Sequence, residues 1–523
     1  MEDKLQKIAK NVVLIIGILL CATVIILNLI YIANLTNDGS ETINIKYYGV
    51  TNLILVLLIG IALYVISKKM EKIRLKPYIE KIVLGIVLVV YFLIQVVWIQ
   101  FRDVDPTADQ MLAYNAAVEI YNGNYEELEG NRYLARNPQQ RTLTMALTII
   151  FKIMHTTNYR VIQTLNALCN TMTIFGLFLI LKKLGKQYNV NKSILLIIST
   201  TFMCIPMLST FVYGDIPSLM LSIYSIYFIM NYTQKNKKRY LIASSILMLF
   251  SYMLRTNNLI FIIAIVIYLI LDILKKKEAY LKKTILILTF IAISIIPNII
   301  IQKQFEKQFN LEENGSFPVT GYLYMGMTEG SRGNGWYNDS ANLAWDHLET
   351  AKQEYPNMIK ERIRYFAENP IYTIRFYTMK LASMWTENTY SALWYNLSFN
   401  FEDIKRNTAT QEDIMQYEQK DEVILKQEEK IRMYQKALIL IIFISTVIVL
   451  IQNRKQLSNE LILLVTIFIG GFLFEILWEA KSRYIIPYIV ILMPVAAIKL
   501  EKLKNDNRVL TKIKKILCVE KSK

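Results

Sequence analysis

Uncharged apolar runs of about twenty residues recur along the chain, without the period of 2 or 3.6 that marks strands or half-buried helices. The runs 12–32 and 82–99 contain no Asp, Glu, Lys or Arg. Each is long enough to cross the hydrocarbon core of a bilayer, about 30 Å thick, as a helix. Helices are expected because a backbone in lipid must satisfy its own hydrogen bonds. The pattern therefore predicts a protein that crosses a membrane many times.

Thirteen apolar segments follow one another along the sequence. The expected fold class is all-α: a polytopic transmembrane helical bundle of about 12–13 spans with two large extracytoplasmic loops. The shortest segment, 141–154, is expected to be a re-entrant or half-depth helix. The segments are 11–34, 48–67, 82–101, 141–154, 161–181, 193–213, 216–231, 240–254, 257–274, 284–301, 436–452, 460–478 and 483–499.

Basic residues are concentrated in the short connections between these segments. The net charge is +17, but loops rich in Lys and Arg are typical of the cytoplasmic side of membrane proteins, so we expect no nucleic-acid partner. Both termini are predicted to be cytoplasmic, which requires an even number of crossings. Twelve crossings with 141–154 re-entrant satisfy this, and failure of the charge rule at one loop is the alternative. The basic regions are 68–81, 182–192, 235–239, 275–283, 454–455 and the tail after 499.

This orientation predicts the domain organisation and a multi-pass location in the cell membrane. Loops 35–47, 102–140 and 302–435 are placed outside, and the last is long enough to fold as a helical subdomain. The expected parts are 1–81, two N-terminal spans and a basic loop; 82–301, a transmembrane core including loop 102–140; 302–435, the external subdomain; 436–500, the C-terminal spans; and 501–523, a basic cytoplasmic tail.

Three carboxylates follow the third span in the motif FRDVDPTADQ, namely Asp103, Asp105 and Asp109. Carboxylates at a membrane edge are costly to desolvate and need a partner, a metal or water. They are therefore candidates for catalysis. The alternative is that they are helix caps and solvated loop charges, with Asp105 as the N-cap of a helix that begins near Pro106.

Polar residues in the same loop and beyond could bind an anionic group. YLARNPQQRTL carries Arg136, Gln139 and Gln140, which suit a lipid headgroup or a pyrophosphate, with interface anchoring as the alternative. FVYGDIPSL places Asp215 in a tight turn between apolar runs, which indicates either a functional acid or a helix cap.

Two further motifs complete the candidates. Arg255 in YMLRTNN, and Arg483 with Tyr484 in EAKSRYIIPY, lie at span edges and suit phosphate contact, or else anchor the helices. In the glycine-rich loop MGMTEGSRGNGWYND, Trp336 and Tyr337 are expected to be an exposed pair that stacks on sugar rings or dips into the interface. The alternative for this pair is an ordinary surface loop without a ligand.

Histidine and cysteine chemistry is not indicated. The chain has two histidines, His155 and His347, too few for a His-based metal site or a Ser-His-Asp triad. Three of the four cysteines lie in apolar runs and one in the basic tail, and no pair has the spacing of metal ligands.

Taken together and in order, these motifs resemble those of the GT-C glycosyltransferases, in particular the bacterial relatives of protein mannosyltransferases. The similarity covers about residues 82–500, so the first two spans and loop 35–47 are a possible N-terminal addition. The motifs are PTADQ, the A-rich helix after it, NPQQ, YGDIPSL, LRTNN, GWYN in the late loop and SRYIIPY before the last span.

The resemblance implies an enzyme that moves a sugar from a polyprenyl-phosphate or polyprenyl-diphosphate carrier to a glycan, lipid or protein acceptor outside the cell, usually with inversion. A first-loop Asp is the general base in such enzymes. Relatives often carry two adjacent acids there, whereas this chain spaces them, so Asp109 is favoured and Asp103 and Asp105 stay open. Asp215 is then expected near the pocket, with Arg255 and Arg483 on the lipid phosphate. No cofactor is certain: the acids suit a divalent metal, but many such enzymes need none.

Two other functions compete with this reading. A transporter or flippase of lipid-linked glycans predicts charges buried at mid-membrane and broken helices in related halves, and the sequence shows neither clearly. A membrane scaffold without enzymatic activity predicts that the external Asp and Arg residues are dispensable.

Overall fold

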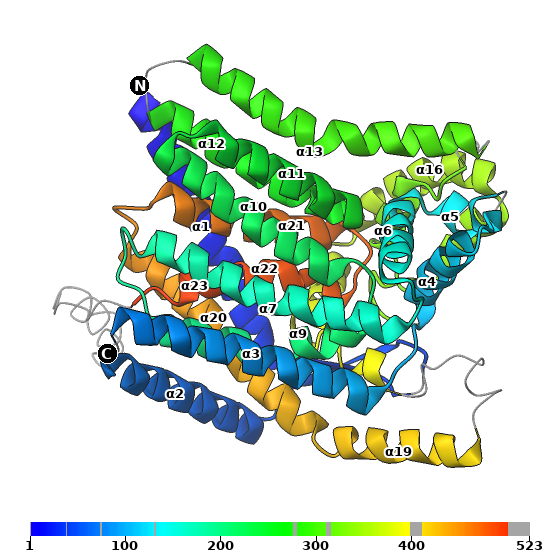
Figure 1. Cartoon of the computed structure of the whole chain (residues 1–523), viewed down its shortest axis with the longest axis horizontal. Coiled ribbons are helices and arrows are strands. Elements are labelled where there is room, and N and C mark those ends of the chain that lie inside the picture. The colour runs from blue at the N-terminus through cyan, green and yellow to red at the C-terminus, as the bar shows by residue number, and fades with distance from the viewer. Residues whose placement is uncertain are drawn as a thin grey trace.

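The computed structural model describes residues 2–37, 39–73, 76–129, 132–275, 280–309, 315–397 and 410–499, and they are almost entirely helical (Figure 1). The predicted class, an all-α polytopic membrane protein, is confirmed. In these ranges nine stretches are long and apolar enough to span a membrane. They are α1 (Glu2–Ile30), α2 (Val50–Lys72), α3 (Pro77–Arg102), α7 (Tyr159–Leu184), a broken span at Lys192–Thr210, α12 (Leu259–Lys275), α13 (Tyr280–Gln308), α20 (Glu428–Gln452) and α21 (Asn459–Leu477).

The other four predicted segments have different forms. Segment 141–154 becomes α6 (Pro138–Met154), and the last segment is divided into η7 (Ser482–Ile485), α22 (Ile486–Val490) and α23 (Met493–Ala496), with prolines near the starts of α22 and α23. The other two are α10 (Asp215–Lys235) and α11 (Lys238–Leu254), which pack against each other. The broken span comprises α8 (Lys192–Thr200), α9 (Cys204–Met207) and η2 (Leu208–Thr210).

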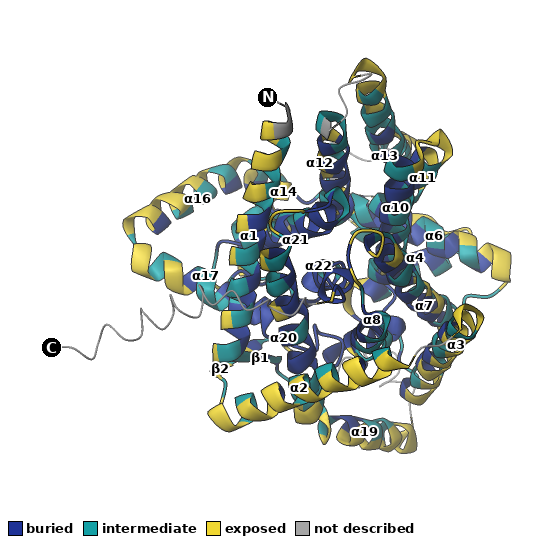
Figure 2. Ribbon diagram, turned by 90° about the vertical axis from the view of Figure 1, so that its left-hand side faces the viewer, coloured by how far each residue is buried: buried dark blue, intermediate teal, exposed yellow. Residues whose placement is uncertain are grey.

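Serine pairs explain why α10 and α11 are less apolar than the outer spans. The hydroxyls of Ser222 and Ser251 lie 2.7 Å apart, and those of Ser225 and Ser244 lie 2.8 Å apart. Small polar residues let two helices approach closely inside a membrane and hydrogen-bond to each other. Figure 2 shows buried residues gathered on the central helices, whereas α2 at the periphery is largely exposed.

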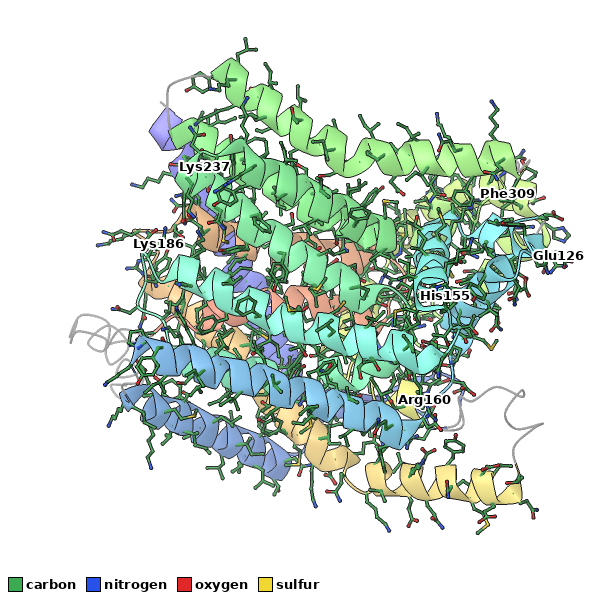
Figure 3. The ribbon with its side chains drawn as sticks, viewed as in Figure 1. Glu126, His155, Arg160, Lys186, Lys237 and Phe309 are labelled. Carbon is green, nitrogen blue, oxygen red and sulfur yellow. The ribbon has the colours of Figure 1, made fainter. Side chains whose placement is uncertain are left out.

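Two of the basic connections lie at the same end of the bundle. Lys186 and Lys237 lie at one end, and Glu126, His155, Arg160 and Phe309 lie at the other (Figure 3). Connections 182–192 and 235–239 are thus at the opposite end from loop 102–140, as the charge pattern predicts. That loop forms α4 (Ala108–Tyr121), η1 (Glu126–Leu128) and α5 (Tyr133–Arg136), and η3 (Thr256–Asn258) precedes α12.

The late region is helical, as predicted, but both limits of 302–435 fall inside helices. The span α13 continues to Gln308, and α20 begins at Glu428. Of its predicted polar stretch, residues 402–409 lie outside the described residues, as does the tail 501–523. The described elements are α14 (Val319–Met325), η4 (Asp339–Ala341), α15 (Asn342–Asp346), α16 (Leu348–Glu368), α17 (Pro370–Trp385), η5 (Trp394–Asn396) and α19 (Gln411–Leu425).

A small hairpin in loop 35–47 was not predicted. Strands β1 (Tyr31–Leu35) and β2 (Ile43–Tyr47) pair antiparallel, with Ala33 opposite Ile45. The hairpin also hydrogen-bonds to the late region, because Ile43 N donates to Arg332 O at 2.9 Å and Ala33 N donates to Thr386 O at 3.2 Å. The hairpin between the first two spans is therefore packed against the late region of the chain.

Candidate functional site

Asp109 is held at the start of α4 by its buried neighbour Gln110. The Gln110 side chain accepts hydrogen bonds from Val212 N at 2.8 Å and from the Tyr159 hydroxyl at 2.7 Å, which joins α4 to the loop before α10. Asp109 itself is exposed, and its Oδ2 accepts a hydrogen bond from the Tyr213 hydroxyl at 3.4 Å. A buried amide thus orients an accessible carboxylate.

The other two first-loop acids point to different partners. Asp103 ends α3 in a left-handed conformation, with φ of 49°, and accepts a hydrogen bond from Arg160 Nε at 2.9 Å. Burial raises the pKa of Tyr114, and the charge of Asp105 raises it further. Asp105 therefore lies near Tyr114 of α4. The proposed N-cap role of Asp105 is wrong, because α4 begins at Ala108 with Thr107 as its N-cap.

Tyr213 connects Asp109 to the rest of the cluster. Its hydroxyl lies 3.0 Å from the Tyr133 hydroxyl and accepts a hydrogen bond from Gln140 Nε2 at 2.7 Å. Burial and the nearby Asp109 raise the pKa of Tyr213 well above its ordinary value, so the hydroxyl remains a donor to Asp109. The predicted residue Gln139 lies beside this group and donates to the Tyr322 hydroxyl at 3.4 Å.

Arg255 and Arg483, the two predicted arginines, both lie near the ring of Tyr213. The guanidinium of Arg255 lies 5.2 Å from the Tyr213 ring and that of Arg483 lies 5.0 Å from it. Arg255 Nε also forms an ion pair with Asp215 Oδ1 at 3.2 Å. Asp215 is the first residue of α10 and Gly214 is its N-cap, so the alternative that Asp215 caps the helix is wrong. Asp109 and both arginines therefore share one ring as a neighbour.

Arg483 has an aromatic rather than an ionic environment. Its side chain is buried, and a guanidinium keeps its charge in proteins, so it is a buried cation. Its Nε has no hydrogen-bond partner within the described ranges. Cation–π contacts stabilise such a group while leaving its N–H donors available. The ring centroids lie 4.6 Å away for Phe211, 5.0 Å for Tyr213, 5.3 Å for Tyr484 and 5.4 Å for Tyr395.

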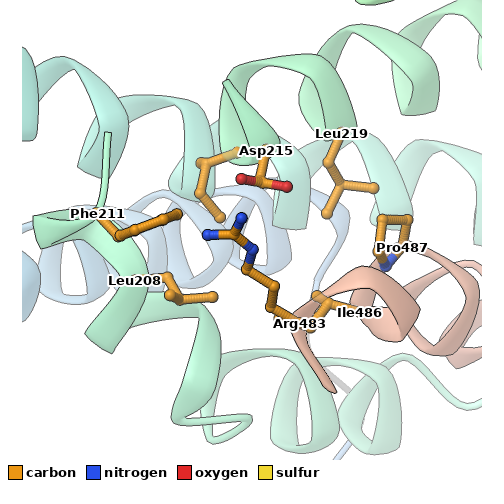
Figure 4. Close-up of a pocket in the computed structure, with 8 residues that line it drawn as sticks. Leu208, Phe211, Asp215, Leu219, Arg483, Ile486 and Pro487 are labelled. Atoms are coloured by element: carbon orange, nitrogen blue, oxygen red, sulfur yellow. The ribbon is translucent and has the colours of Figure 1, made fainter. Parts of the chain in front are cut away.

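A pocket opens beside the cluster, with a charged end and an apolar wall. Figure 4 shows the guanidinium of Arg483 directed toward the carboxylate of Asp215 across the pocket. Asp215 Oδ2 is buried and has no hydrogen-bond partner in the part of the chain that the structure describes. The remaining lining residues are Leu208, Phe211, Ile216, Leu219, Ile486 and Pro487. Such a pocket suits a ligand with an anionic group and an apolar chain.

The segment that carries Arg483 and Tyr484 is held by a buried lysine. Lys380 Nζ donates to Gly326 O at 2.6 Å, Ile476 O at 2.9 Å and Trp478 O at 2.6 Å. Burial lowers the pKa of Lys380, but three acceptors require the three N–H donors of an ammonium. The approach is close, since a Cβ on Gly326 would lie 2.3 Å from Leu477 O. Lys380 therefore fixes the end of α21 against the glycine-rich loop.

Further charged residues of the cluster were missed at the sequence level. Lys481 and Arg332 each lie 2.8 Å from the carboxylate of Glu41, which comes from the N-terminal hairpin. Glu479 is 8% exposed and lies close enough to Asp109 and Arg483 to be influenced by both charges. Glu479 and Lys481 flank Ala480 just before SRYIIPY, so their position beside this motif could have indicated them. No feature of the sequence indicated Glu41, because its loop lies outside the motifs.

Three further predicted residues, Arg136, Trp336 and Tyr337, lie outside the cluster around Tyr213. Arg136 is buried and donates to Ala344 O at 2.8 Å, so it holds α5 against α15. The expected exposed Trp-Tyr pair is wrong for Trp336, which is 1% exposed and donates to Ser383 Oγ at 2.8 Å. Its large ring gains more from burial than from exposure at the surface. Tyr337 lies under the guanidinium of Arg332 at 5.3 Å.

No group of three or more His, Cys, Asp or Glu side chains among the described residues has the arrangement of a metal site. The acids of the cluster are instead distributed over separate partners: Asp215 to Arg255, and Glu41 to Lys481 and Arg332.

Glu479 is expected to make stability depend on pH. Burial, opposed by Lys481 and aided by Glu41 and Asp109, raises its pKa from 4.5 to about 7. Between pH 4.5 and about pH 7 the folded protein holds a proton that the unfolded chain releases. The free energy of unfolding therefore falls as the pH rises over this range, up to about 7. The loss is at most about 3 kcal/mol, since each pKa unit is worth about 1.4 kcal/mol.

Thermal unfolding of the detergent-solubilised protein between pH 5 and pH 8 measures this effect. Glu479→Gln, which cannot ionise, should flatten the dependence, whereas Glu126→Gln at an exposed position should not. An unchanged dependence in Glu479→Gln would show that this carboxyl is not the titrating group.

Comparison with known proteins places the chain among membrane proteins. Residues 5–504 match a family model described as "conserved hypothetical integral membrane protein". No curated protein matches the sequence.

Proposed function

The chain belongs to this family of integral membrane proteins, and we propose that it is a glycosyltransferase that transfers a sugar from a polyprenyl-phosphate donor to an acceptor hydroxyl. The observation that carries the proposal is the convergence of Asp109, Arg255 and Arg483 on Tyr213. These residues lie far apart in sequence, in the motifs PTADQ, LRTNN and SRYIIPY. A base and a phosphate-binding cation beside one apolar pocket are the parts that this reaction needs.

Each group has a distinct role in the proposed reaction. Asp109 Oδ accepts the proton of the acceptor hydroxyl as its oxygen attacks the anomeric carbon. A new C–O bond forms, and the bond between that carbon and the phosphate oxygen breaks, with inversion. The lipid phosphate leaves with the electron pair, and Arg483 stabilises the charge that develops on it. Arg255 neutralises Asp215, so that Asp215 does not repel the phosphate.

The apolar wall of the pocket suits the lipid part of the donor. Leu208, Ile216, Leu219 and Ile486 line the same pocket as Arg483. A polyprenyl chain whose phosphate binds Arg483 would contact these side chains where the pocket opens, and each CH₂ that it buries contributes roughly 0.8 kcal/mol. A water-soluble nucleotide sugar would gain nothing from such a wall.

The proposed reaction takes place on the extracytoplasmic face of the cell membrane. The site lies at the opposite end of the bundle from Lys186 and Lys237 (Figure 3). Lys- and Arg-rich connections mark the cytoplasmic side of a membrane protein. On the extracytoplasmic face, an activated sugar is supplied as a lipid-linked donor.

A transporter or flippase of lipid-linked glycans is the second candidate, and one structural feature, the broken helices, favours it. The spans at 192–210 and 482–496 are broken, and Lys436 and Glu475 are buried within spans. Both charges lie toward the site rather than at mid-membrane: Lys436 Nζ donates to Tyr31 O, just after α1, and Glu475 is two residues from the end of α21. Broken helices alone therefore support transport.

A single reconstituted system separates the two candidates. Purified protein in liposomes is supplied with labelled polyprenyl-phosphate sugars and a mixture of glycan, lipid and peptide acceptors. The glycosyltransferase proposal expects label in an acceptor. Movement of labelled donor between leaflets, with no transfer to any acceptor and no effect of Asp109→Asn on that movement, would overturn it in favour of the flippase.

A further inference from the structure

Two helices project sideways from the bundle at the end that holds the site. In Figure 2, α16 and α17 extend beyond α1, away from the central helices. Residues at the tip, where α16 ends and α17 begins, are apolar and exposed: Ile371 is 85% exposed and Ile374 is 69% exposed. They lie three residues apart on a helix and so share a face. Ile363 and Tyr365 on α16 are exposed as well.

The contacts of Arg362 hold the tip of the α16–α17 hairpin together and leave these apolar residues exposed. Arg362 donates to Met327 O at 2.6 Å and to the Tyr372 hydroxyl at 2.5 Å. Its guanidinium also lies 4.6 Å from the Phe366 ring and 5.4 Å from the Phe376 ring. The inner faces of α16 and α17 are therefore packed around a cation, and the isoleucines are held outward.

Charged side chains, with basic ones in excess, surround the apolar tip. Lys360, Arg364 and Arg375 are exposed and lie within a few residues of the exposed isoleucines, as do the exposed acids Glu361 and Glu368. Apolar residues flanked by Lys and Arg are typical of helices that lie in a membrane interface, because the long basic side chains reach lipid phosphates.

The base of α17 lies where the spans end. Asn28, near the end of α1, donates to Trp385 O at 3.0 Å, and Lys380 donates to Ile476 O at the end of α21. Leu473 and Leu477 beside that contact are exposed, as lipid-facing residues of a span are. The helix thus runs from the membrane boundary sideways, which continues the lipid-facing surface of the bundle.

We propose that the tip of the α16–α17 hairpin is embedded in the adjacent membrane leaflet. Ile371 and Ile374 enter the boundary between headgroups and acyl chains, and Arg364 and Arg375 bind the phosphates of anionic lipids. The partner is a lipid surface, and this contact is independent of whether the protein transfers sugars.

Site-specific labelling of the full-length protein in nanodiscs that contain phosphatidylglycerol tests the proposal. Ile371→Cys is labelled with an environment-sensitive fluorophore and compared with two reference positions. Glu126→Cys reports solvent at the same end of the bundle, and Leu288→Cys reports lipid on the exposed side of α13. Labelled protein without an added cysteine gives the background from the native cysteines.

The expected result is strong quenching of the Ile371 label by spin-labelled lipids and at least threefold less quenching by aqueous iodide than at Glu126. Iodide quenching equal to that of Glu126 would overturn the proposal. Protection that occurs only in discs with two protein copies would also overturn it, because the surface would then bind a second copy of the chain.

Discussion

Asp109→Asn is expected to lower sugar transfer by about 10²- to 10⁴-fold, the range over which a positioned general base contributes. The amide keeps the size of the carboxylate but cannot accept the proton of the acceptor hydroxyl. Asp109 is the exposed acid of the cluster, and Tyr213 donates to it at 3.4 Å. Initial rates with a polyprenyl-phosphate sugar measure the effect.

Asp103→Asn is the matched control for this change. It makes the same chemical substitution in the same loop, but the structure places Asp103 against Arg160, away from Tyr213. Most of the transfer activity should remain. If Asp103→Asn were the inactive variant and Asp109→Asn the active one, the assignment of the base would be wrong. Binding of the donor to Asp109→Asn should persist, because the phosphate is held elsewhere.

Arg483→Gln is expected to lower transfer by about 10²- to 10³-fold, the usual cost of removing one group that stabilises a developing charge. The guanidinium is held by Phe211 and Tyr395 and faces the pocket. Its loss removes the cation that stabilises the leaving phosphate. Donor binding should weaken as well, since the ground-state phosphate carries charge too.

Two comparisons separate this role from a structural one. Arg160→Gln removes an arginine at the same end of the bundle but outside the pocket, and should retain most activity. Arg483→Lys keeps the charge but loses the planar group that stacks on aromatic rings, so it should recover part of the transfer activity. Thermal unfolding reports whether each variant is folded. A folded Arg483→Gln with full activity would contradict the assignment.

The sequence predicted the fold class for a physical reason. Spanning helices are required by the bilayer, so apolar runs identify them directly. Charged residues at span edges are costly to desolvate, so the sequence alone marks Asp109, Asp215, Arg255 and Arg483 as candidates. The structure brings these four residues together around Tyr213.

The remaining site residues depend on tertiary contacts that no local pattern encodes. Asp103, Asp105 and Asp109 are equivalent in sequence, and only the turn after α3 directs them to different partners. Trp336 appeared exposed because its loop is glycine-rich, yet those glycines allow the loop to fold over the ring. Lys380 reads as an ordinary helix residue, and its three acceptors come from sequence positions 54 to 98 residues away.

The location of the donor phosphate tests the central claim most directly. An electron cryomicroscopy structure of the protein with a bound polyprenyl-phosphate sugar would locate that phosphate. We predict hydrogen bonds from Arg483 to the phosphate, the lipid along Leu219 and Ile486, and the sugar between the phosphate and Asp109. A donor phosphate bound at the opposite end, near Lys186 and Lys237, would contradict the proposed site.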